Sequence, residues 1–311
     1  MNFHTQDPIQ KEFVSSLKTG HASIEMIQSI TTLSRTDAQN GFLDGALFIA
    51  SLNSERHQLN SVLAVAFASS KGHPIIKWKH PLKGTRGGTS NAETQEMLYN
   101  CCGELWSTFV PGAPGMIENN INPTFGLSNG SNCTLVAISP TCKDDAEAIE
   151  RTPPGDEVVI SMPEIVFVHI PFLDTLPTKS NLYQKHSGIR CVPISATHDE
   201  SKLGTTKVGY LHHPVCLCFA STVHKCQGKT LKRVVLCISR NKGAPKITFE
   251  QFLVASTRVR KFADMRRLQM DDSTTEHLKG GLFADKTFDT YFGGRFLGDE
   301  RQYDGSDPPP P

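Results

Sequence analysis

The sequence predicts an α/β fold in which a parallel-sheet domain is interrupted by a small insertion made of β-strands. Short apolar runs alternate with amphipathic helix patterns over the first third of the chain. Between Pro111 and about Ala220 the helical period is lost, and short β-rich runs separated by Pro, Gly, Asn and Thr replace it; after Pro214 the alternation returns. Alternating strands and helices are typical of parallel sheets, and many short strands with turns are typical of small barrels or sandwiches.

The N-terminal third is expected to contain helices and two strands. Residues 7–33 predict two short amphipathic helices, the first packing through Ile9, Phe13 and Leu17. The run 45–51 predicts a strand, and a helix is expected to begin at Asn53. Its packed face should contain the apolar residues spaced three and four apart: Leu59, Val62, Leu63, Ala66 and Phe67. Residues 74–78 predict a second strand of the same parallel sheet, and residues 91–105 a further helix.

The middle and the end of the chain follow in the same way. The β-rich part predicts strands at 134–138, 157–161, 165–170 and 189–194, with no helix among them. After Pro214 we expect a strand at 233–239, a helix at 249–258 and a short strand near Arg267. The polar tail from Gly298 ends in four prolines and is expected to be disordered or extended.

Composition excludes several classes of protein. The chain has 311 residues, with 32 basic and 31 acidic side chains, so contact with nucleic acid would require a local groove. Nine cysteines without a charged-then-apolar leader predict an intracellular protein with reduced thiols. The apolar runs are much shorter than the roughly 20 residues that span a bilayer, so no membrane segment is expected.

Two motifs carry most of the functional information. Residues 222–231 read TVHKCQGKTL, and residues 252–260 read FLVASTRVR. The first ends like a phosphate-binding P-loop, but Val223 stands where that loop requires its opening glycine. The sequence contains no G-x-x-x-x-G-K-[ST] motif, so a phosphate cradle of that kind is not predicted.

Together these motifs resemble the last two motifs of PIF-type superfamily 1 DNA helicases. The resemblance covers most of residues 40–270 and includes the strand-Asn-helix segment 46–60 and residues 118–130. It implies a second RecA-like domain, of the P-loop NTPase type, interrupted by a small Src-homology-like β-barrel. The implied organisation is an N-terminal helical segment (1–39), the RecA-like domain (40–125 and 208–270), the barrel (126–207) and a C-terminal extension (271–311).

The resemblance also implies roles for individual residues. Arg258 would be the finger that neutralises charge on the γ-phosphate, because a guanidinium stays charged and offers a rigid fork of donors. A loop coupling ATP to DNA would contain these side chains: Thr222, His224, Lys225, Gln227 and Gly228. Asn53 and Asn129 are weaker candidates for DNA contact, and Asn53 could equally cap the helix that it begins.

Cofactors and partners follow from the same resemblance. ATP and Mg²⁺ would be shared with a first RecA-like domain, supplied in cis or in trans, which we expect this chain to lack. The whole helicase would translocate on single-stranded DNA and unwind duplexes or junctions, in DNA repair and recombination. The family implies the nucleus or the mitochondrion, and the chain alone is expected to be inactive.

Three alternatives stay open at this point. The chain could be a non-catalytic remnant of such a helicase that binds nucleic acid or protein. Several His and Cys residues between His212 and Cys226 could suggest zinc or a nucleophile, but they lack a C-x-x-C spacing and no metal site is predicted. The aromatic residues of 278–293 could stack on bases, although an amphipathic cover is the simpler interpretation.

Ser256 departs from the family, since it stands where an apolar residue is usual and could loosen the helix.

Overall fold

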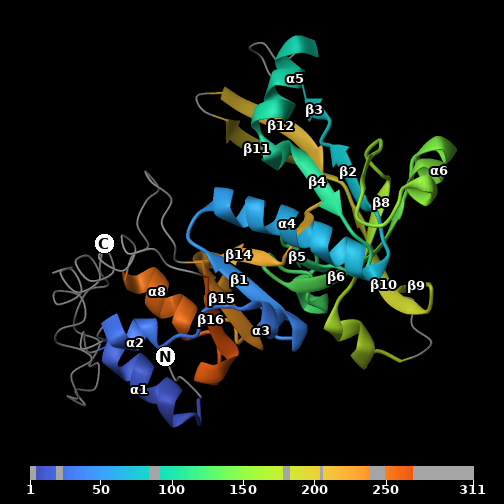
Figure 1. The fold of residues 1–311 in the computed structure, drawn as a ribbon. Helices are drawn as coiled ribbons and strands as arrows, with labels where there is room; N and C mark the ends of the chain where they lie inside the picture. The colour runs from blue at the N-terminus through green and yellow to red at the C-terminus, as the bar shows by residue number, and fades with distance from the viewer. Residues whose placement is uncertain are drawn as a thin grey trace, which may run out of the picture. The chain divides into compact units, whose positions relative to one another are not determined.

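The structure is a computed structural model that describes residues 5–18, 24–83, 92–177, 183–203, 206–237 and 249–268. The chain forms two compact units. Unit 1 combines residues 1–52 with residues 222–311, and unit 2 is the continuous stretch Asn53–Ser221. Figure 1 labels the elements of both.

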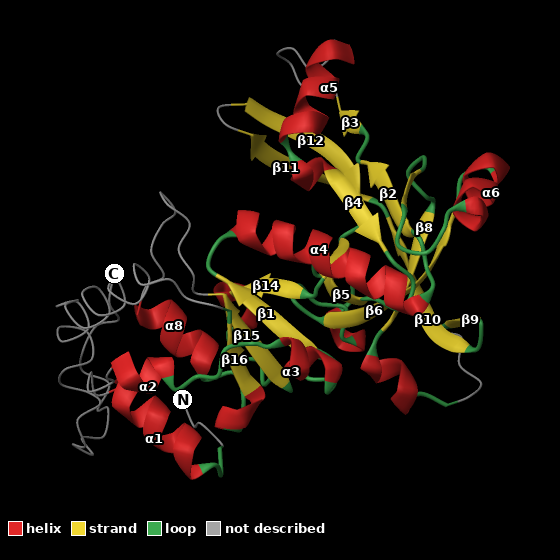
Figure 2. Ribbon diagram, in the orientation of Figure 1, coloured by secondary structure: helices red, strands yellow, loops and turns green. Residues whose placement is uncertain are grey.

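Unit 1 contains a parallel sheet. β1 (Ala46–Ala50) pairs in parallel with β15 (Arg233–Cys237), and β15 pairs in parallel with β16 (Met265–Arg267). The short strand β14 (Ala220–Thr222), at the junction of the two units, lies on the other side of β1, so the order is β14-β1-β15-β16. Figure 2 shows β1, β15 and β16 side by side. The α/β fold with a parallel sheet is therefore confirmed.

Helices accompany the sheet of unit 1, and most of them contribute buried side chains to its core. They are α1 (Pro8–Lys18), α2 (Ile24–Gln28), α3 (Arg35–Gln39), α7 (Val223–Cys226) and α8 (Phe249–Ser256). Buried side chains of β15 pack with those of α1 and α8, among them Val234, Phe13 and Phe252. α3 begins with a capping box in which Ser34 and Asp37 bind each other's backbone N–H groups.

Unit 2 begins with the long helix α4 (Asn53–Lys71) and is otherwise mainly antiparallel. Its strands form three sheets. The six-stranded sheet has the order β13-β5-β6-β8-β10-β9, and its neighbouring strands all pair antiparallel. The other two sheets have the orders β11-β12-β3 and β4-β2-β7.

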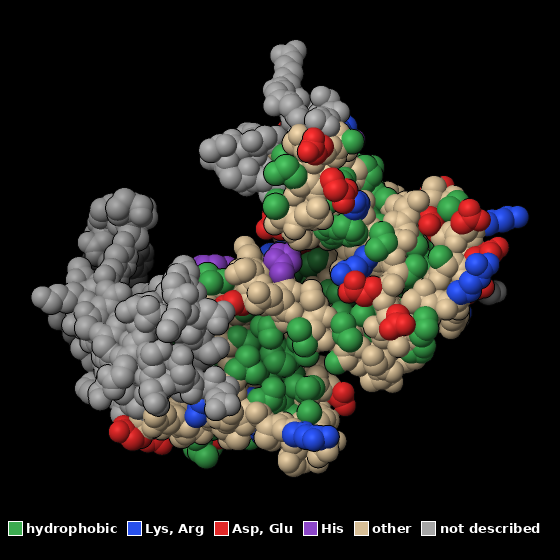
Figure 3. Space-filling view, turned by 45° about the horizontal axis from the view of Figure 1, so that its top comes forward, with side chains coloured by type: hydrophobic (Ala, Val, Ile, Leu, Met, Phe, Trp, Pro, Cys, Tyr) green, Lys and Arg blue, Asp and Glu red, His purple; other side chains and the backbone are tan. Residues whose placement is uncertain are grey.

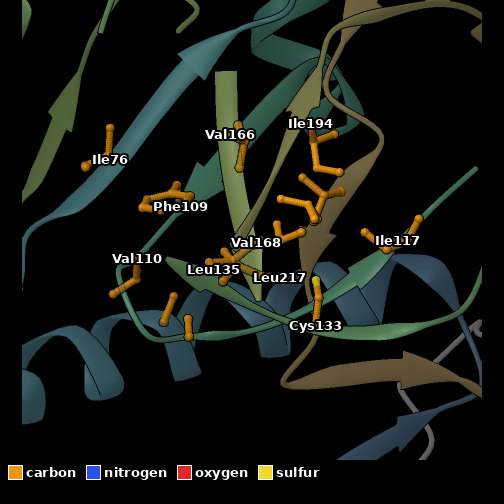
Figure 4. Close-up of a cluster of buried hydrophobic side chains, with 14 of the residues drawn as sticks. Ile76, Phe109, Val110, Ile117, Cys133, Leu135, Val166, Val168, Ile194 and Leu217 are labelled. Atoms are coloured by element: carbon orange, nitrogen blue, oxygen red, sulfur yellow. The ribbon is translucent and has the colours of Figure 1, made fainter. Parts of the chain in front are cut away.

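The strands of unit 2 have these bounds: β2 (Ile75–Lys79), β3 (Leu82–Lys83), β4 (Trp106–Phe109), β5 (Pro114–Ile117), β6 (Asn132–Ser139), β7 (Glu157–Val159), β8 (Ile165–His169), β9 (Gln184–His186), β10 (Ile189–Ser195), β11 (Thr197–Leu203), β12 (Thr206–His212) and β13 (Val215–Leu217). Two helices join them, α5 (Ala92–Cys101) and α6 (Lys143–Arg151). The core lies between these elements, with Phe109, Leu135 and Val168 near its centre (Figure 4).

The strand pairing corrects one prediction. The strand predicted at 74–78 exists as β2, but it pairs with β4 and β7 instead of joining β1 in the parallel sheet. The neighbours of β1 are β14 and β15, which lie far along the sequence. A strand-helix-strand pattern fixes the type of each element without fixing the sheet that a strand enters, because short apolar runs pair with many partners.

The packed faces of two helices also differ from those predicted. In α1 the buried residues are Gln10, Phe13, Val14 and Leu17, whereas Ile9 is 60% exposed. In α4 the buried stripe is Arg56, Asn60, Ala64 and Ala68, whereas Val62 is 68% exposed. In both helices the buried face includes polar residues, which a search for apolar periodicity passes over.

The helix α6 was not predicted, and the expectation that the β-rich part between Pro111 and about Ala220 contains no helix was wrong. α6 has Asp144 and Asp145 in its first turn and Arg151 in its last, which favour a helix through its dipole. No side chain of α6 is fully buried. Its apolar residues, Ala146, Ala148 and Ile149, are half-buried and span only one turn, so the apolar stripe is too short to reveal a helix by its period.

The sheets of unit 2 draw strands from both inside and outside residues 126–207. β6 and β8 lie inside that range, while β5 and β13 of the same sheet lie outside it. The predicted domain boundaries stay a prediction. The extension 271–311, including the aromatic segment 278–293, lies outside the described residues.

Candidate functional site

The two sequence motifs come together in unit 1. The Thr222 motif forms α7 and the turn that follows it, and Arg258 lies just after the end of α8. α7 contacts both α8 and β1. Between the two motifs the chain passes through β15, and buried side chains of α7, β15 and α8 share one core.

α7 is a single amphipathic turn. Thr222 precedes it in an extended conformation and is 9% exposed. Val223 and Cys226 are buried in the core of unit 1, while His224 and Gln227 are exposed. The packed pair therefore fixes the turn and leaves an imidazole and an amide accessible for hydrogen bonding.

Gly228 ends this turn in a left-handed conformation, with φ of +80°. The N–H of Lys229 then donates to the carbonyl of Cys226 at 3.1 Å, which closes the helix end. A side chain at position 228 would meet no atom within 4 Å. Backbone conformation, and not space, is what requires glycine here.

Arg258 is buried and bonded within its own unit. Its side chain is 6% exposed. Nε donates to the carbonyl of Val254 at 2.7 Å, Nη2 to Thr257 Oγ1 at 2.7 Å and Nη1 to the carbonyl of Lys229 at 3.3 Å. Burial lowers the pKa of Arg258, although a guanidinium remains protonated in proteins.

Two hydrogen bonds connect the motifs directly. Besides the Arg258 bond to Lys229, the N–H of Leu231 donates to the carbonyl of Arg258 at 2.8 Å. One bond therefore uses the side chain of Arg258 and the other its backbone. A movement of the turn after α7 would change the surroundings of the guanidinium.

The two weaker candidates lie in unit 2, on separate elements. Asn53 is the exposed first residue of α4. Asn129 is exposed in the turn before β6, where its N–H donates to Asn120 Oδ1 at 2.9 Å. Their roles stay predictions.

Three buried polar side chains escaped the sequence analysis as site candidates. Gln10 is fully buried beside α8. Asn60 exchanges two hydrogen bonds with the backbone of Ala220. Arg56 is 8% exposed on the same stripe of α4 as Asn60. A polar residue at the spacing of a buried helix face was the available signal for each of them.

The histidines near Cys216 form a packed aromatic group. His212 lies 5.7 Å from His80 between ring centroids, and Tyr210 stacks on His80 at 5.5 Å. His213 meets Trp78 edge-on at 6.0 Å. Within the described residues no three His, Cys, Asp or Glu side chains are grouped as metal ligands would be.

Charges on the described surface are mixed. On the face drawn in Figure 3, acidic and basic side chains are interspersed. Among the described helices, none combines the length and apolarity that crossing a membrane requires.

Part of the chain matches a known protein family. Residues 177–262 match the viral superfamily 1 RNA helicase core domain. Among curated proteins, no sequence matches the chain.

Solved structures of Pif1 helicases share the fold. One is the Pif1 helicase from Candida albicans, with 15% identity, a TM-score of 0.57, and coverage of 92% of this chain and 57% of that chain. In a structure of Pif1 helicases at forked double-stranded DNA the identity is 13% and the TM-score 0.54, with coverage of 94% and 54%. For Bacteroides Pif1 bound to single-stranded DNA the identity is 11% and the TM-score 0.51, with coverage of 94% and 55%.

This chain therefore spans a little over half the length of these helicases. The family match falls on the segment that contains α7 and Arg258, and the structural matches cover nearly all of the chain. The resemblance of this protein to part of a Pif1-type superfamily 1 helicase, predicted from its motifs, is confirmed.

Proposed function

We propose that this chain is the second motor part of an ATP-dependent DNA helicase of the Pif1 type. In this proposal unit 1 acts as the second RecA-like domain, and the antiparallel unit 2 contains the counterpart of the small inserted Src-homology-like barrel. ATP hydrolysis would require a first RecA-like domain in cis or in trans, which would hold most of the nucleotide.

The observation that supports the proposal best is the direct bonding between the two motifs. A motor must transmit a change at the nucleotide to the nucleic acid. Arg258 donates to the Lys229 carbonyl, and Leu231 donates to the Arg258 carbonyl, so the arginine and the turn after α7 form one hydrogen-bonded unit. The contact to Lys229, at 3.3 Å, is the longest of the three guanidinium bonds. A phosphate oxygen would replace it at the smallest cost in hydrogen bonding.

The residues fit ATP better than they fit its metal ion. Arg258, Lys225 and the exposed His224 and Gln227 are donors or cations suited to phosphate oxygens. None of the residues proposed for this site is a carboxylate, the ligand that Mg²⁺ prefers. We propose that the first domain would hold Mg²⁺ and that this chain would supply positive charge.

The proposed partner is single-stranded DNA or a DNA junction. The exposed side chains of α7 could donate to backbone phosphates, and Asn53 and Asn129 would add contacts from unit 2. An exposed amide or imidazole suits any phosphate backbone, so this contact would be independent of base sequence. The proposal places the protein in the nucleus or the mitochondrion.

Reconstitution of ATP hydrolysis tests the proposal. The chain alone should not hydrolyse ATP, and adding a separately produced first RecA-like domain of a Pif1-type helicase should restore DNA-stimulated hydrolysis. Arg258→Ala should then lower kcat by at least about 10³-fold, the range found for arginine fingers. The exposed Arg260 provides the matched control, since Arg260→Ala should retain most of the activity. Hydrolysis by the chain alone would contradict the proposal.

One observation favours a second candidate, a non-catalytic remnant that binds nucleic acid or protein. All three guanidinium nitrogens of Arg258 already have acceptors within the unit, as in a purely structural arginine. Binding of single-stranded DNA without restored hydrolysis would favour this candidate.

A further inference from the structure

The N-terminal segment packs against the segment that contains Arg258. α1 contacts α8 in unit 1. The ring of Phe13 lies 6.5 Å from that of Phe252 and 5.3 Å from that of Phe262, edge-on in both cases. These contacts fix α1 to both sides of the arginine.

Three hydrogen bonds also connect the N-terminal segment to the backbone around Arg258. Gln10 Nε2 donates to the carbonyl of Ser256 at 2.9 Å, two residues before Arg258. The hydroxyl of Thr5 donates to the carbonyl of Arg260, two residues after it. The N–H of Phe262 donates to Asp7 Oδ2 at 2.6 Å. The backbone is therefore held on both sides of Arg258 by side chains from the start of the chain.

Gln10 is an unusual residue for this position. It shares its face of α1 with Phe13, Val14 and Leu17, and it is fully buried. Its Oε1 has no hydrogen-bond partner in the part of the chain that the structure describes. A buried amide oxygen without a partner is unfavourable, so an apolar residue of similar volume would suit packing at least as well. The bond to Ser256 is the contact that only a donor can make.

We propose that Gln10 is a positioning residue for Arg258. By holding the last carbonyl of α8, it sets where the helix ends and hence where the guanidinium lies relative to Lys229. The inference about position depends only on the contacts described above. Its consequence for hydrolysis rests on the proposed function.

Asp7 offers an independent way to test the same clamp. Its Oδ1 accepts from the N–H of Ile9 at 3.1 Å at the start of α1, and its Oδ2 accepts from Phe262. Asparagine has one oxygen in place of two, so Asp7→Asn can retain one of these bonds and must lose the other. Asparagine is a good helix N-cap, so its single oxygen should keep the bond to the N–H of Ile9. The bond to Phe262 is therefore the one that we expect to be lost.

The first experiment measures how fast phenylglyoxal modifies each arginine of the full chain, using mass spectrometry. In Gln10→Met, which removes the donor at similar volume, modification of Arg258 should accelerate at least about fivefold. Glu12→Met, at an exposed position of α1, is the matched control and should leave the rate unchanged. Arg233 and Arg266, which both lie over Phe42 in the same unit, serve as internal references.

The outcome decides the inference in either direction. A rise confined to Arg258 supports it, in Gln10→Met or, if that variant fails to fold, in Gln10→Leu, which also lacks the donor. A similar rise in Asp7→Asn, which leaves Gln10 unchanged, supports the wider clamp of which the Gln10 bond is a part. An unchanged rate at Arg258 in a folded variant would overturn it. An equal rise at Arg233 and Arg266 would also overturn it, because general loosening of unit 1 would then be the cause.

A second readout separates this inference from the proposed function. In the reconstituted enzyme, Gln10→Met should lower kcat about tenfold and leave the KM for ATP within about twofold, because an arginine acting in the transition state affects kcat first. If Arg258→Ala leaves hydrolysis unchanged, the proposed function fails, while the modification rates still decide whether Gln10 positions Arg258. If Arg258→Ala abolishes hydrolysis and Gln10→Met changes only the KM for ATP and not kcat, the positioning role is overturned.

Discussion

At the scale of single residues, the structure explains how a serine is accommodated at position 256. The sequence suggested that a hydroxyl there could loosen the helix. Ser256 is fully buried, and its Oγ donates to the carbonyl of Phe252 at 2.7 Å. This bond to the preceding turn satisfies the hydroxyl within the helix. A buried polar side chain at this position therefore leaves no unpaired donor.

Gly228 gives a prediction for one residue. Gly228→Ala should lower the free energy of unfolding by about 1–2 kcal/mol, because alanine is strained at positive φ. Chemical denaturation monitored by circular dichroism would measure the change. Gly103→Ala is the matched control, since position 103 also has no atom within 4 Å but an ordinary φ. Equal stability of the two variants would show that the left-handed conformation is not what requires glycine at 228.

The site was only partly predictable from sequence. Arg258 and the turn after α7 belong to contiguous motifs, and local sequence was enough to single them out. Gln10 contacts Ser256 across 246 positions, and no local pattern reveals such a partner. A single polar residue on an apolar stripe predicts that its side chain makes a hydrogen bond, but it does not predict the partner.

At the scale of elements, Asn60 joins α4 to β14. Its Oδ1 accepts from the N–H of Ala220 at 2.9 Å, and its Nδ2 donates to the Ala220 carbonyl at 3.2 Å. Asn60→Ala should cost about 1–3 kcal/mol of stability, because it leaves buried backbone groups without partners. Thermal unfolding would measure this, with the exposed neighbour Ser61→Ala as control. A loss of the same size in Ser61→Ala would show that the bonds to Ala220 are not the cause, because helix propensity alone would favour alanine at both positions.

Gly115 lies in a crowded part of the six-stranded sheet. A Cβ at this position would lie 2.9 Å from both Cys133 Sγ and Leu135 Cδ2 and 3.3 Å from the Cys216 carbonyl. Gly115→Ala should therefore destabilise the protein by about 1–3 kcal/mol through overpacking. Gly209→Ala, whose Cβ would meet Lys83 Cβ at an ordinary 3.6 Å, should be far milder under the same denaturation assay. Comparable losses at both positions would rule out crowding as the explanation.

The elements were more predictable than their partners. β1, β8 and β15 lie close to where apolar runs predicted them, because a buried strand needs such a run. The pairing of β1 with β15 joins residues 46 and 233, and sequence periodicity contains no information about partners at that distance. α6 was missed for a different reason, since its apolar residues span only one turn, from Ala146 to Ile149.

At the scale of the whole molecule, buried histidines should make stability depend on pH. Burial is the main cause that lowers the pKa of His80 to about 3 and that of His213 to about 4. Neighbouring histidines lower both pKa values further, while a backbone hydrogen bond, to Glu104 for His80 and to Glu164 for His213, partly opposes each shift. Below about pH 6.5 the unfolded chain binds protons that the folded chain cannot bind, so folding becomes less favourable as the pH falls toward 4.

Below about pH 6.5, each of these histidines should lower the free energy of unfolding by at most about 1.4 kcal/mol per pH unit; we call this part of the pH profile the acid limb. Above about pH 7 these histidines should cause no change in the free energy of unfolding. Urea denaturation across this pH range would measure it. His213→Phe keeps an aromatic ring against Trp78 and removes one titrating group, so its acid limb should be shallower. An equally steep limb in the variant would assign the acid sensitivity to other groups.

The division of the chain into units also sets the order in which they can form during synthesis. Unit 2 is continuous, from Asn53 to Ser221, and all of its strands are available once the ribosome has passed that point. Unit 1 cannot form until residues near its C-terminal end have been synthesised, because β1 pairs with β15 and the bond between Asp7 and Phe262 spans 255 positions. Throughout that interval the amino-terminal helices carry exposed apolar faces without their partners, and this is the period in which a nascent chain most needs a chaperone.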